Sequence, residues 1–185
     1  ITLDGSIVSY APGQDFNGSD SFIFSVSDGE LIITAEATLT ITAVNDAPVL
    51  ATVSDISFNE DEAVTTTLSA SDVDQDALTF STIGGNNIID TLDGSDVTFS
   101  ALQDFNGSES FSMSVTDGEY TDSQSITVTV NPINDAPVLS AVGDREVDED
   151  SSLNFLLSAS DVEGDLLTYS VTSGTNITST LAGND

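Results

Sequence analysis

Short acidic motifs recur along this sequence, and their residue types point to one kind of chemistry. Asp72 and Asp74 are separated by a single residue, and the same spacing returns as Asp161 and Glu163. Two carboxylates at this spacing can direct oxygen atoms at one cation from a single loop. Hard oxygen ligands in flexible loops suit calcium (Ca²⁺), which takes about 6–8 oxygens in proteins. The motifs therefore predict a calcium site.

The overall charge also favours a cation as partner. The 185 residues include 32 Asp and Glu but a single Lys or Arg, Arg145, so the formal net charge is −31. Carboxylates held about 4 Å apart repel by on the order of 4 kcal/mol, so something must neutralise them. The same charge excludes nucleic-acid binding and opposes contact with anionic membranes. No apolar run is long enough to span a bilayer, so we expect no membrane insertion.

The residue inventory argues against catalysis. The sequence has no histidine, cysteine or lysine, so a nucleophilic triad is not available. Paired carboxylates can hydrolyse glycosides, but here the pairs recur in every repeat, which is typical of structural sites. Without cysteine there are no disulfides, so a secreted protein needs another source of rigidity, and bound metal is a candidate. We expect a protein that is not an enzyme.

The acidic positions belong to a repeat with a period of 89 residues. NDAPVL begins at Asn45 and again at Asn134, and Asp15 of DFNGSDSF corresponds to Asp104 of DFNGSESF. The segment SASDVDQDALTF from Ser69 returns 89 residues later as SASDVEGDLLTY. These pairs share one spacing without insertion or deletion, which indicates a tandem array of similar modules.

The phase of the repeat divides the chain into three parts. Residues 45–133 are one complete repeat, residues 1–44 match the C-terminal half of another, and residues 134–185 match the N-terminal half of a third. Half a module would leave open sheet edges and an exposed apolar face. We expect a segment of a longer array. The alternative is a filament subunit whose half-modules complement each other head to tail between chains, a form of self-association.

Within each repeat the apolar residues follow a period of two. Phe111, Met113 and Val115 alternate with serines, and Ile126 and Val128 alternate with Thr127. Such alternation predicts strands with one face in a core and one in water. Asp-Gly and Asn-Gly pairs supply turns between these runs. About seven short strands in about 90 residues indicate an antiparallel β-sandwich.

The combination of motifs resembles a known family. NDAPVL, the Glu60-Asp61 pair, SASDVDQDALTF and DFNGS occur in the order found in bacterial cadherin-like tandem repeats. Those repeats build the stalks of large secreted adhesins and RTX-type surface proteins. The resemblance covers the whole chain. It implies all-β, cadherin-like (Ig-like) Greek-key sandwich modules in a row, with calcium at the junctions, in an extracellular or cell-surface protein.

The resemblance also implies which residues bind calcium at each junction. The first junction would use Asp15, Asn45, Asp46, Asp72, Asp74 and Asp117. The second would use Glu60, Asp104, Asn134, Asp135, Asp161 and Glu163. An ordinary hydrogen-bonded or solvated turn is the alternative at every one of these positions. The chain departs from the animal pattern at Asn106, which stands where a glutamate ligand is expected.

The expected function is a calcium-rigidified stalk segment whose partners are the neighbouring repeats of the same chain. The alternative is a cadherin-like module that binds a polysaccharide, a protein or another surface ligand. Glycan sites are commonly built on exposed aromatic residues, and the chain has no Trp and only three Tyr, so we rank this second. Asp61, Asp76 and Asp122 are expected on the solvated surface.

Overall fold

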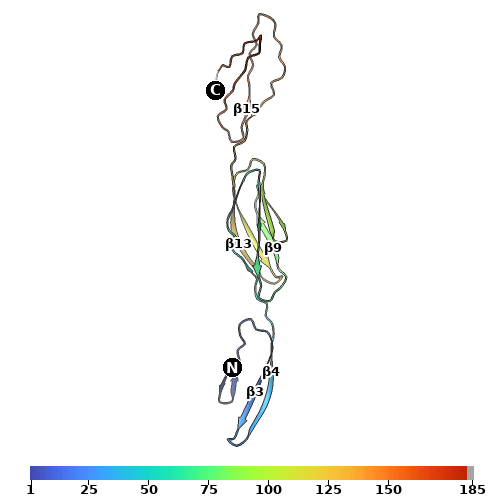
Figure 1. Ribbon diagram of the computed structural model, residues 1–185, viewed down its shortest axis with the longest axis vertical. Coiled ribbons are helices and arrows are strands. Elements are labelled where there is room, and N and C mark those ends of the chain that lie inside the picture. Colours follow the sequence, from blue (N-terminus) through green and yellow to red (C-terminus); the bar gives the residue numbers. More distant parts are fainter. Residues whose placement is uncertain (183–185) are drawn as a thin grey trace.

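The computed structural model describes residues 1–182, which consist of strands joined by turns and loops. Figure 1 shows three bodies that follow one another along the long axis. We call them the N-terminal segment (residues 1–44), the central sandwich (residues 45–133) and the C-terminal segment (residues 134–182). The all-β fold class is confirmed. Within the described residues, no helix has the length and apolar character needed to cross a membrane.

The central sandwich holds most of the strands. They are β5 (Val49–Leu50), β6 (Ile56–Asn59), β7 (Ala63–Thr67), β8 (Ala70–Ser71), β9 (Thr79–Gly84), β10 (Ile88–Asp93), β11 (Asp96–Ala101), β12 (Gly107–Thr116) and β13 (Thr121–Asn131). One sheet has the order β6-β13-β12-β9 and the other β10-β11-β7. The connections β7–β9 and β11–β12 cross between the sheets, as in a Greek key.

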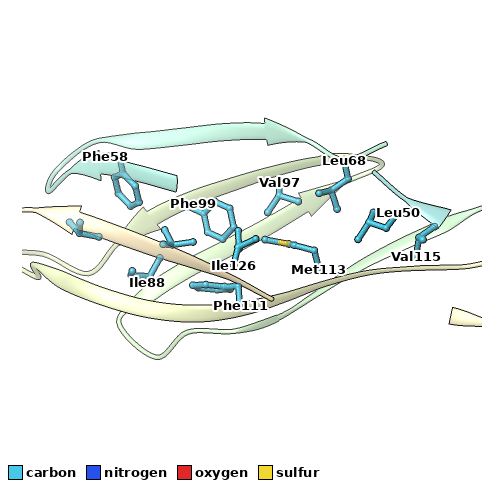
Figure 2. Packing of buried hydrophobic residues seen from close by; sticks show 12 residues of the cluster. Leu50, Phe58, Leu68, Ile88, Val97, Phe99, Phe111, Met113, Val115 and Ile126 are labelled. Atoms are coloured by element: carbon cyan, nitrogen blue, oxygen red, sulfur yellow. The ribbon is translucent and has the colours of Figure 1, made fainter. Parts of the chain in front are cut away.

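The alternating residues of the central strands form the core between the two sheets. Phe111, Met113 and Val115 of β12 are at most 1% exposed, and Val97 and Phe99 of β11 face them from the other sheet. The rings of Phe99 and Phe111 meet edge to face with centroids 5.0 Å apart, a favourable aromatic geometry. Figure 2 shows this packing. The period of two in the sequence therefore correctly predicted which side chains are buried.

The first strand of the sandwich changes sheets, and polar side chains hold it in place. β5 pairs with β8, whereas β6 pairs in parallel with β13. The N–H of Leu50, the last residue of β5, donates to Asp122 Oδ2 (2.8 Å), and the N–H of Val53, between β5 and β6, donates to Gln124 Oε1 (3.0 Å). The expectation that Asp122 belongs to the solvated surface is therefore wrong. Its carboxylate satisfies a backbone donor that no sheet partner reaches.

The turn between β9 and β10 is organised by the carboxylate of Glu109. It accepts hydrogen bonds from the backbone N–H groups of Asn86, Asn87 and Ile88 over 2.8–3.2 Å. Partial burial acts to raise the pKa of Glu109, but these N–H groups outweigh it and lower the pKa below its ordinary value. The ionised carboxylate thus stabilises the turn.

The two end segments contain fewer strands. The N-terminal segment has β1 (Thr2–Asp4) paired with β2 (Ile7–Ser9), and β3 (Gly18–Ser27) paired with β4 (Ile32–Ile41). The C-terminal segment has β14 (Val138–Leu139) paired with β15 (Ala159–Ser160). Apolar residues lie open in both, such as Val26 at 70% and Leu156 at 98% exposure.

We predict that replacing Gly85 by Ala destabilises the central sandwich by about 3 kcal/mol. The cost of a left-handed backbone at a residue with a side chain adds to the cost of overpacking. Gly85 has φ +71°. A methyl group there would clash with the carbonyl oxygen of Ile88 and would lie only 2.6 Å from Phe111 Cζ. Gly94→Ala is the matched control, because Gly94 has φ +62° but open space around it. That variant should lose about 1.5 kcal/mol. Urea unfolding measures both, and equal losses would contradict the steric argument.

We predict that Glu109→Gln lowers the unfolding free energy by about 1.5 kcal/mol at neutral pH, since the backbone N–H groups lose their charged acceptor. The pKa of Glu109 is lowered in the fold. The contribution of Glu109 to the unfolding free energy is therefore complete above its unfolded pKa, about 4.3, and is lost as the pH falls through its folded pKa. The variant and the parent should therefore converge toward pH 3. Unfolding curves across pH, with exposed Glu119→Gln as control, test this, and a pH-independent difference would refute it.

Candidate metal centre

The loop between β8 and β9 gathers three carboxylates at the first linker (residues 42–48). Oxygen atoms of Asp72, Asp74 and Asp76 lie within 4.8 Å of one another. Asp72 Oδ1 accepts the backbone N–H groups of Asp74 (2.9 Å) and Asp76 (3.3 Å), which folds the loop around this carboxylate. Asp72 Oδ2 is buried and has no hydrogen-bond partner among the described residues. This loop, with the linker beside it, is the first joint.

The linker residues of the first joint bind to the top of the central sandwich. Asn45 Nδ2 donates to Asp117 Oδ2 (3.0 Å), and the backbone N–H of Asp46 donates to Asp74 Oδ2 (2.8 Å). These contacts join residues 72 and 28 positions apart in the sequence. Five of the six predicted residues of this joint thus fall into two hydrogen-bonded groups, Asn45 with Asp117 and Asp46 with Asp74 and Asp72, and the adjacent residues Asn45 and Asp46 connect the groups.

Asp117 has two roles in the first joint. Its Oδ1 accepts the N–H groups of Glu119 and Tyr120, both at 2.7 Å, which forms the turn between β12 and β13. The N–H of Tyr120, with those of Glu119 and Asn45, holds the pKa of Asp117 below its ordinary value. One oxygen of Asp117 therefore belongs to a hydrogen-bonded turn, which was the alternative to calcium binding at this position. The other oxygen faces the linker.

The sixth predicted residue of the first joint, Asp15, precedes β3 in the N-terminal segment. Gly18, the first residue of β3, pairs with Ile41 at the end of β4, so this loop lies beside the linker. Asp15 has a left-handed backbone with φ 57°, and its counterpart Asp104 has φ 58°. A non-glycine residue in this region is uncommon, and Asp is among the types that tolerate it.

Glu60 occupies the corresponding place at the base of the central sandwich, where the second linker (residues 132–137) leaves it. It is the only charged side chain among the buried polar residues described, at 3% exposure. One carboxylate oxygen, Oε1, accepts the backbone N–H of Ile133 in the linker. The other oxygen, Oε2, is buried without a hydrogen-bond partner among the described residues. Glu60 thus contacts the linker and still presents a free ligand atom.

The second joint (Glu60, Asp61, Asp104, Asp135 and Glu163) concentrates negative charge. Burial raises the pKa of Asp135, and the charges of Glu163, Asp104, Asp61 and Glu60 raise it further. Asp135 Oδ2 is buried and has no partner within residues 1–182. These five residues come from the central sandwich, the linker and the C-terminal segment. They share a site that is electrostatically unfavourable without a cation.

The remaining predicted residues of the second joint hydrogen-bond within their own segments. Asn134 Nδ2 donates to the carbonyl of Asp135 (2.8 Å). Asp161 Oδ1 accepts the N–H of Asp165 (3.0 Å), which repeats the contact between Asp72 and Asp76 in the first joint. The loop of Asp161 therefore shares this hydrogen bond with the loop of Asp72.

Two acidic residues of these groups were not among the predicted ligands. Asp76 lies within the carboxylate cluster of the first joint, and Asp61 adds to the charge around Asp135. Both recur one period later, as Asp165 and Asp150, but a repeat cannot distinguish a ligand from a surface carboxylate. Asp61 and Asp150 also share left-handed φ values of 62° and 59°, which the sequence does not reveal.

The two joints have the donor set of a calcium site. Every candidate ligand is a carboxylate or amide oxygen, which calcium prefers over softer donors. Three buried oxygen atoms, Glu60 Oε2, Asp72 Oδ2 and Asp135 Oδ2, lack hydrogen-bond partners in the described part of the chain, although buried polar atoms normally have one. Arg145, the one basic side chain, lies with its Cζ 5.4 Å from the centroid of the Phe155 ring. The residues present therefore fit calcium.

The chain is similar to several solved structures, each with a low TM-score. Human protocadherin-24 EC1-2 is 25% identical with a TM-score of 0.42, over 64% of this chain and 61% of that chain. An endo-fucoidan hydrolase of glycoside hydrolase family 107 gives 18% identity and a TM-score of 0.38, over 71% and 23%. The surface layer protein SbsC, domains 4-9, gives 13% identity and a TM-score of 0.35, over 79% and 26%.

Comparison with known sequences identifies the family of the chain. Chitinase A of Pseudoalteromonas piscicida is 31% identical over 130 residues, which are 68% of this chain and 16% of that protein. The chain thus spans about a sixth of the length of this relative. The family model described as the bacterial Ig domain matches residues 1–42 and again residues 45–129, more than half of the chain. This chain belongs to the bacterial Ig domain family.

Proposed function

We propose that this chain is a non-catalytic spacer segment of an extracellular surface protein, such as a secreted adhesin, and that calcium at its two joints makes it rigid. The observation that carries the proposal is a set of buried oxygen atoms that have no hydrogen-bond partner among residues 1–182, namely Glu60 Oε2, Asp72 Oδ2 and Asp135 Oδ2. Leaving a buried polar atom unsatisfied costs about 1–3 kcal/mol, and more when it is charged. A bound cation removes that cost at both joints.

Calcium fits these joints better than magnesium does. Calcium accepts about 6–8 oxygen ligands in variable geometry, whereas magnesium demands a near-ideal octahedron and retains water. The first joint offers Asp72, Asp74 and Asp76 from one loop. The backbone N–H of Asp46 is bonded to Asp74, and Asp117 is bonded to the neighbouring linker residue Asn45. Loops of this kind supply irregular sets of oxygens. Affinities of about 10⁻⁴–10⁻³ M, the range of extracellular modules, would keep the sites loaded outside cells.

Calcium would act by linking parts of the chain that repel one another. At the second joint, Glu60 and Asp104 belong to the central sandwich, Asp135 to the linker and Glu163 to the C-terminal segment. An ion held by all three parts fixes the angle between them. Calcium at tenfold above its Kd stabilises the bound state by about 1.4 kcal/mol per site. The expected result is a straight and stiff rod.

A structural role agrees with the chemistry of the chain and with its family. The sequence lacks histidine, cysteine and lysine, and the paired carboxylates face linkers. The bacterial Ig domain match covers the acidic loops before residue 130, including that of Asp72. Domains of this type are typically extracellular, where calcium is abundant. The relative named chitinase is matched along a small part of its length, which is consistent with a shared accessory module.

We predict that calorimetry of the 185-residue chain in moderate salt finds saturable calcium sites that magnesium does not fill. Asp72→Asn combined with Asp74→Asn should remove the sites of the first joint, because both carboxylates of that loop are lost. Small-angle scattering in calcium should then show a shorter and more variable molecule. The matched control is Asp144→Asn with Glu146→Gln, which removes the same charge from exposed positions in the C-terminal segment. Absence of saturable heat, or equal effects of both variants, would refute the proposal.

We predict that Asp135→Asn has opposite effects with and without calcium. The pKa of Asp135 is raised in the fold, so its contribution to stability is full below the unfolded pKa and is lost as the pH rises through the folded pKa. Near neutral pH in chelator, Asn should raise the melting temperature because it removes repulsion. In excess calcium the same variant should lower it, because a ligand is missing. The same sign in both buffers would mean that Asp135 is not a ligand.

A further inference from the structure

Two segments of the central sandwich run side by side and lead to opposite linkers. Residues 50–60 follow the first linker, and residues 122–133 lead into the second. Within these segments β6 and β13 pair in parallel, with Ile56 beside Val128. Figure 1 shows that the linkers leave opposite ends of the central body and that β13 runs along its length. Tension applied to the two linkers therefore acts directly on these two segments.

Side chains extend the contact between the segments beyond the short β6–β13 ladder, toward the first linker. Gln124 Nε2 donates to the carbonyl oxygens of Leu50 (3.0 Å) and Ala51 (3.2 Å). Gln124 Oε1 accepts the N–H of Val53 (3.0 Å), and Asp122 Oδ2 accepts the N–H of Leu50 (2.8 Å). Gln124 and Asp122 thus attach the backbone to β13 where the chain passes from β5 to β6.

Further hydrogen bonds continue the same alignment to the second linker. The N–H of Thr127 donates to Asp55 Oδ1 (2.8 Å) just before the ladder begins. Beyond the ladder, the N–H of Glu60 donates to the carbonyl of Asn131 (3.0 Å), and Glu60 Oε1 accepts the N–H of Ile133. The side-chain contacts join residues 71–74 positions apart in the sequence. This nearly constant offset means that the two segments stay parallel along their whole length.

The parallel direction of the segments decides how they respond to tension. The linkers pull the start of one segment and the end of the other in opposite directions along the strands. The segments can then separate only by sliding, which strains their hydrogen bonds together instead of one after another. Leu50, Phe58, Val128 and Val130, which lie on these segments, are at most 6% exposed, so sliding would also withdraw apolar side chains from the core.

We propose that residues 50–60 and 122–133 form a shear clamp, which carries tension between the two linkers, and that the side chain of Gln124 strengthens this clamp. The inference rests on the proposed spacer function, since a spacer that is held at both ends transmits tension. The clamp lies along the body of the sandwich, whereas the calcium joints lie at its ends. Gln124 is not a candidate calcium ligand, so the clamp and the joints can be tested separately.

The N-terminal segment indicates a substitution that this strand accepts. In β3 and β4, Phe24 pairs with Ala35, and the corresponding pair of the central sandwich is Met113 with Gln124. An alanine therefore occupies the position of Gln124 in an equivalent pair of strands. Gln124→Ala removes three hydrogen bonds of the clamp and leaves the backbone ladder of β6 and β13 in place.

The test is single-molecule force spectroscopy of the whole chain, pulled through a cysteine added at each end, since the chain has no cysteine of its own. Unfolding of residues 45–133 is recognised by a gain of about 300 Å in contour length, from about 3.3–3.6 Å per residue. The rate of forced unfolding is the rate of the unfolding step itself. At a fixed force, Gln124→Ala should raise this rate at least about tenfold, because the lost hydrogen bonds resist sliding.

Glu109→Gln is the matched control. Glu109 also binds several backbone groups, but it connects β12 to the β9–β10 turn, away from the two segments of the clamp. Its substitution should change the rate under force less than about threefold, because a contact that is intact when the clamp yields does not alter the unfolding rate. Urea unfolding measures the equilibrium loss of each variant, so that each change in rate is compared per unit of lost stability.

A second measurement changes the direction of pulling and keeps the clamp contacts. Glu62→Cys with Ile133→Cys places both attachment points at the same end of the parallel segments, just after β6 and just after β13. Pulling there peels the segments apart one hydrogen bond at a time, because the bonds of a parallel pair are evenly spaced along it. The central sandwich should therefore unfold at a clearly lower force than it does when pulled from the chain ends.

Both measurements are made in calcium and in chelator. A larger effect of Gln124→Ala than of Glu109→Gln, together with a dependence on pulling direction, supports the clamp. Equal effects of the two variants per unit of lost stability overturn it, and so do equal unfolding forces in the two directions. Calcium calorimetry of Gln124→Ala should match that of the parent chain. Absence of saturable calcium heat would refute the calcium joints, while the result in chelator would still decide the clamp.

Discussion

Repulsion between carboxylates at the linkers is the constraint on which the architecture of this protein depends. Glu60 is buried beside the second linker, and Asp135 shares that site with Glu163, Asp104 and Asp61. The chain has no spare basic side chain to neutralise them, because Arg145 is its only one and lies over Phe155. Bringing these oxygens together is electrostatically unfavourable, and in our proposal a bound calcium ion offsets that repulsion. Under that proposal, the joints couple the shape of the molecule to its ionic environment.

Acidic residues of this chain have opposite roles that depend on their surroundings. Asp117 and Glu109 accept several backbone N–H groups, and their pKa values are lowered, so the ionised form stabilises the turns. Asp135 meets other carboxylates in a partly buried site, and its pKa is raised. The carboxylates of Asp117 and Glu109 replace the hydrogen bonds of a sheet partner where the backbone leaves the sheet. The carboxylate of Asp135 is the kind that, in our proposal, binds calcium.

Much of the fold could be predicted from the sequence, and less of the site. The alternation of Phe111, Met113 and Val115 with serines correctly identified the core, because the side-chain period of a strand is two wherever it lies. The fixing of β5 by Asp122 and of the β9–β10 turn by Glu109 was missed. Both carboxylates satisfy backbone groups contributed by segments far away in the sequence. No local pattern reports such a contact.

The sequence by itself determined the strand pattern, the turns and the recurrence of acidic loops, because these depend on residue types at short range. Only the tertiary structure decided which oxygens meet. Asn45 reaches Asp117 across 72 positions, and Glu60 reaches the linker at Ile133 across 73. These contacts form because Greek-key connections bring the ends of distant strands to the same end of the sandwich. Burial of individual oxygen atoms follows from that packing and not from the repeat.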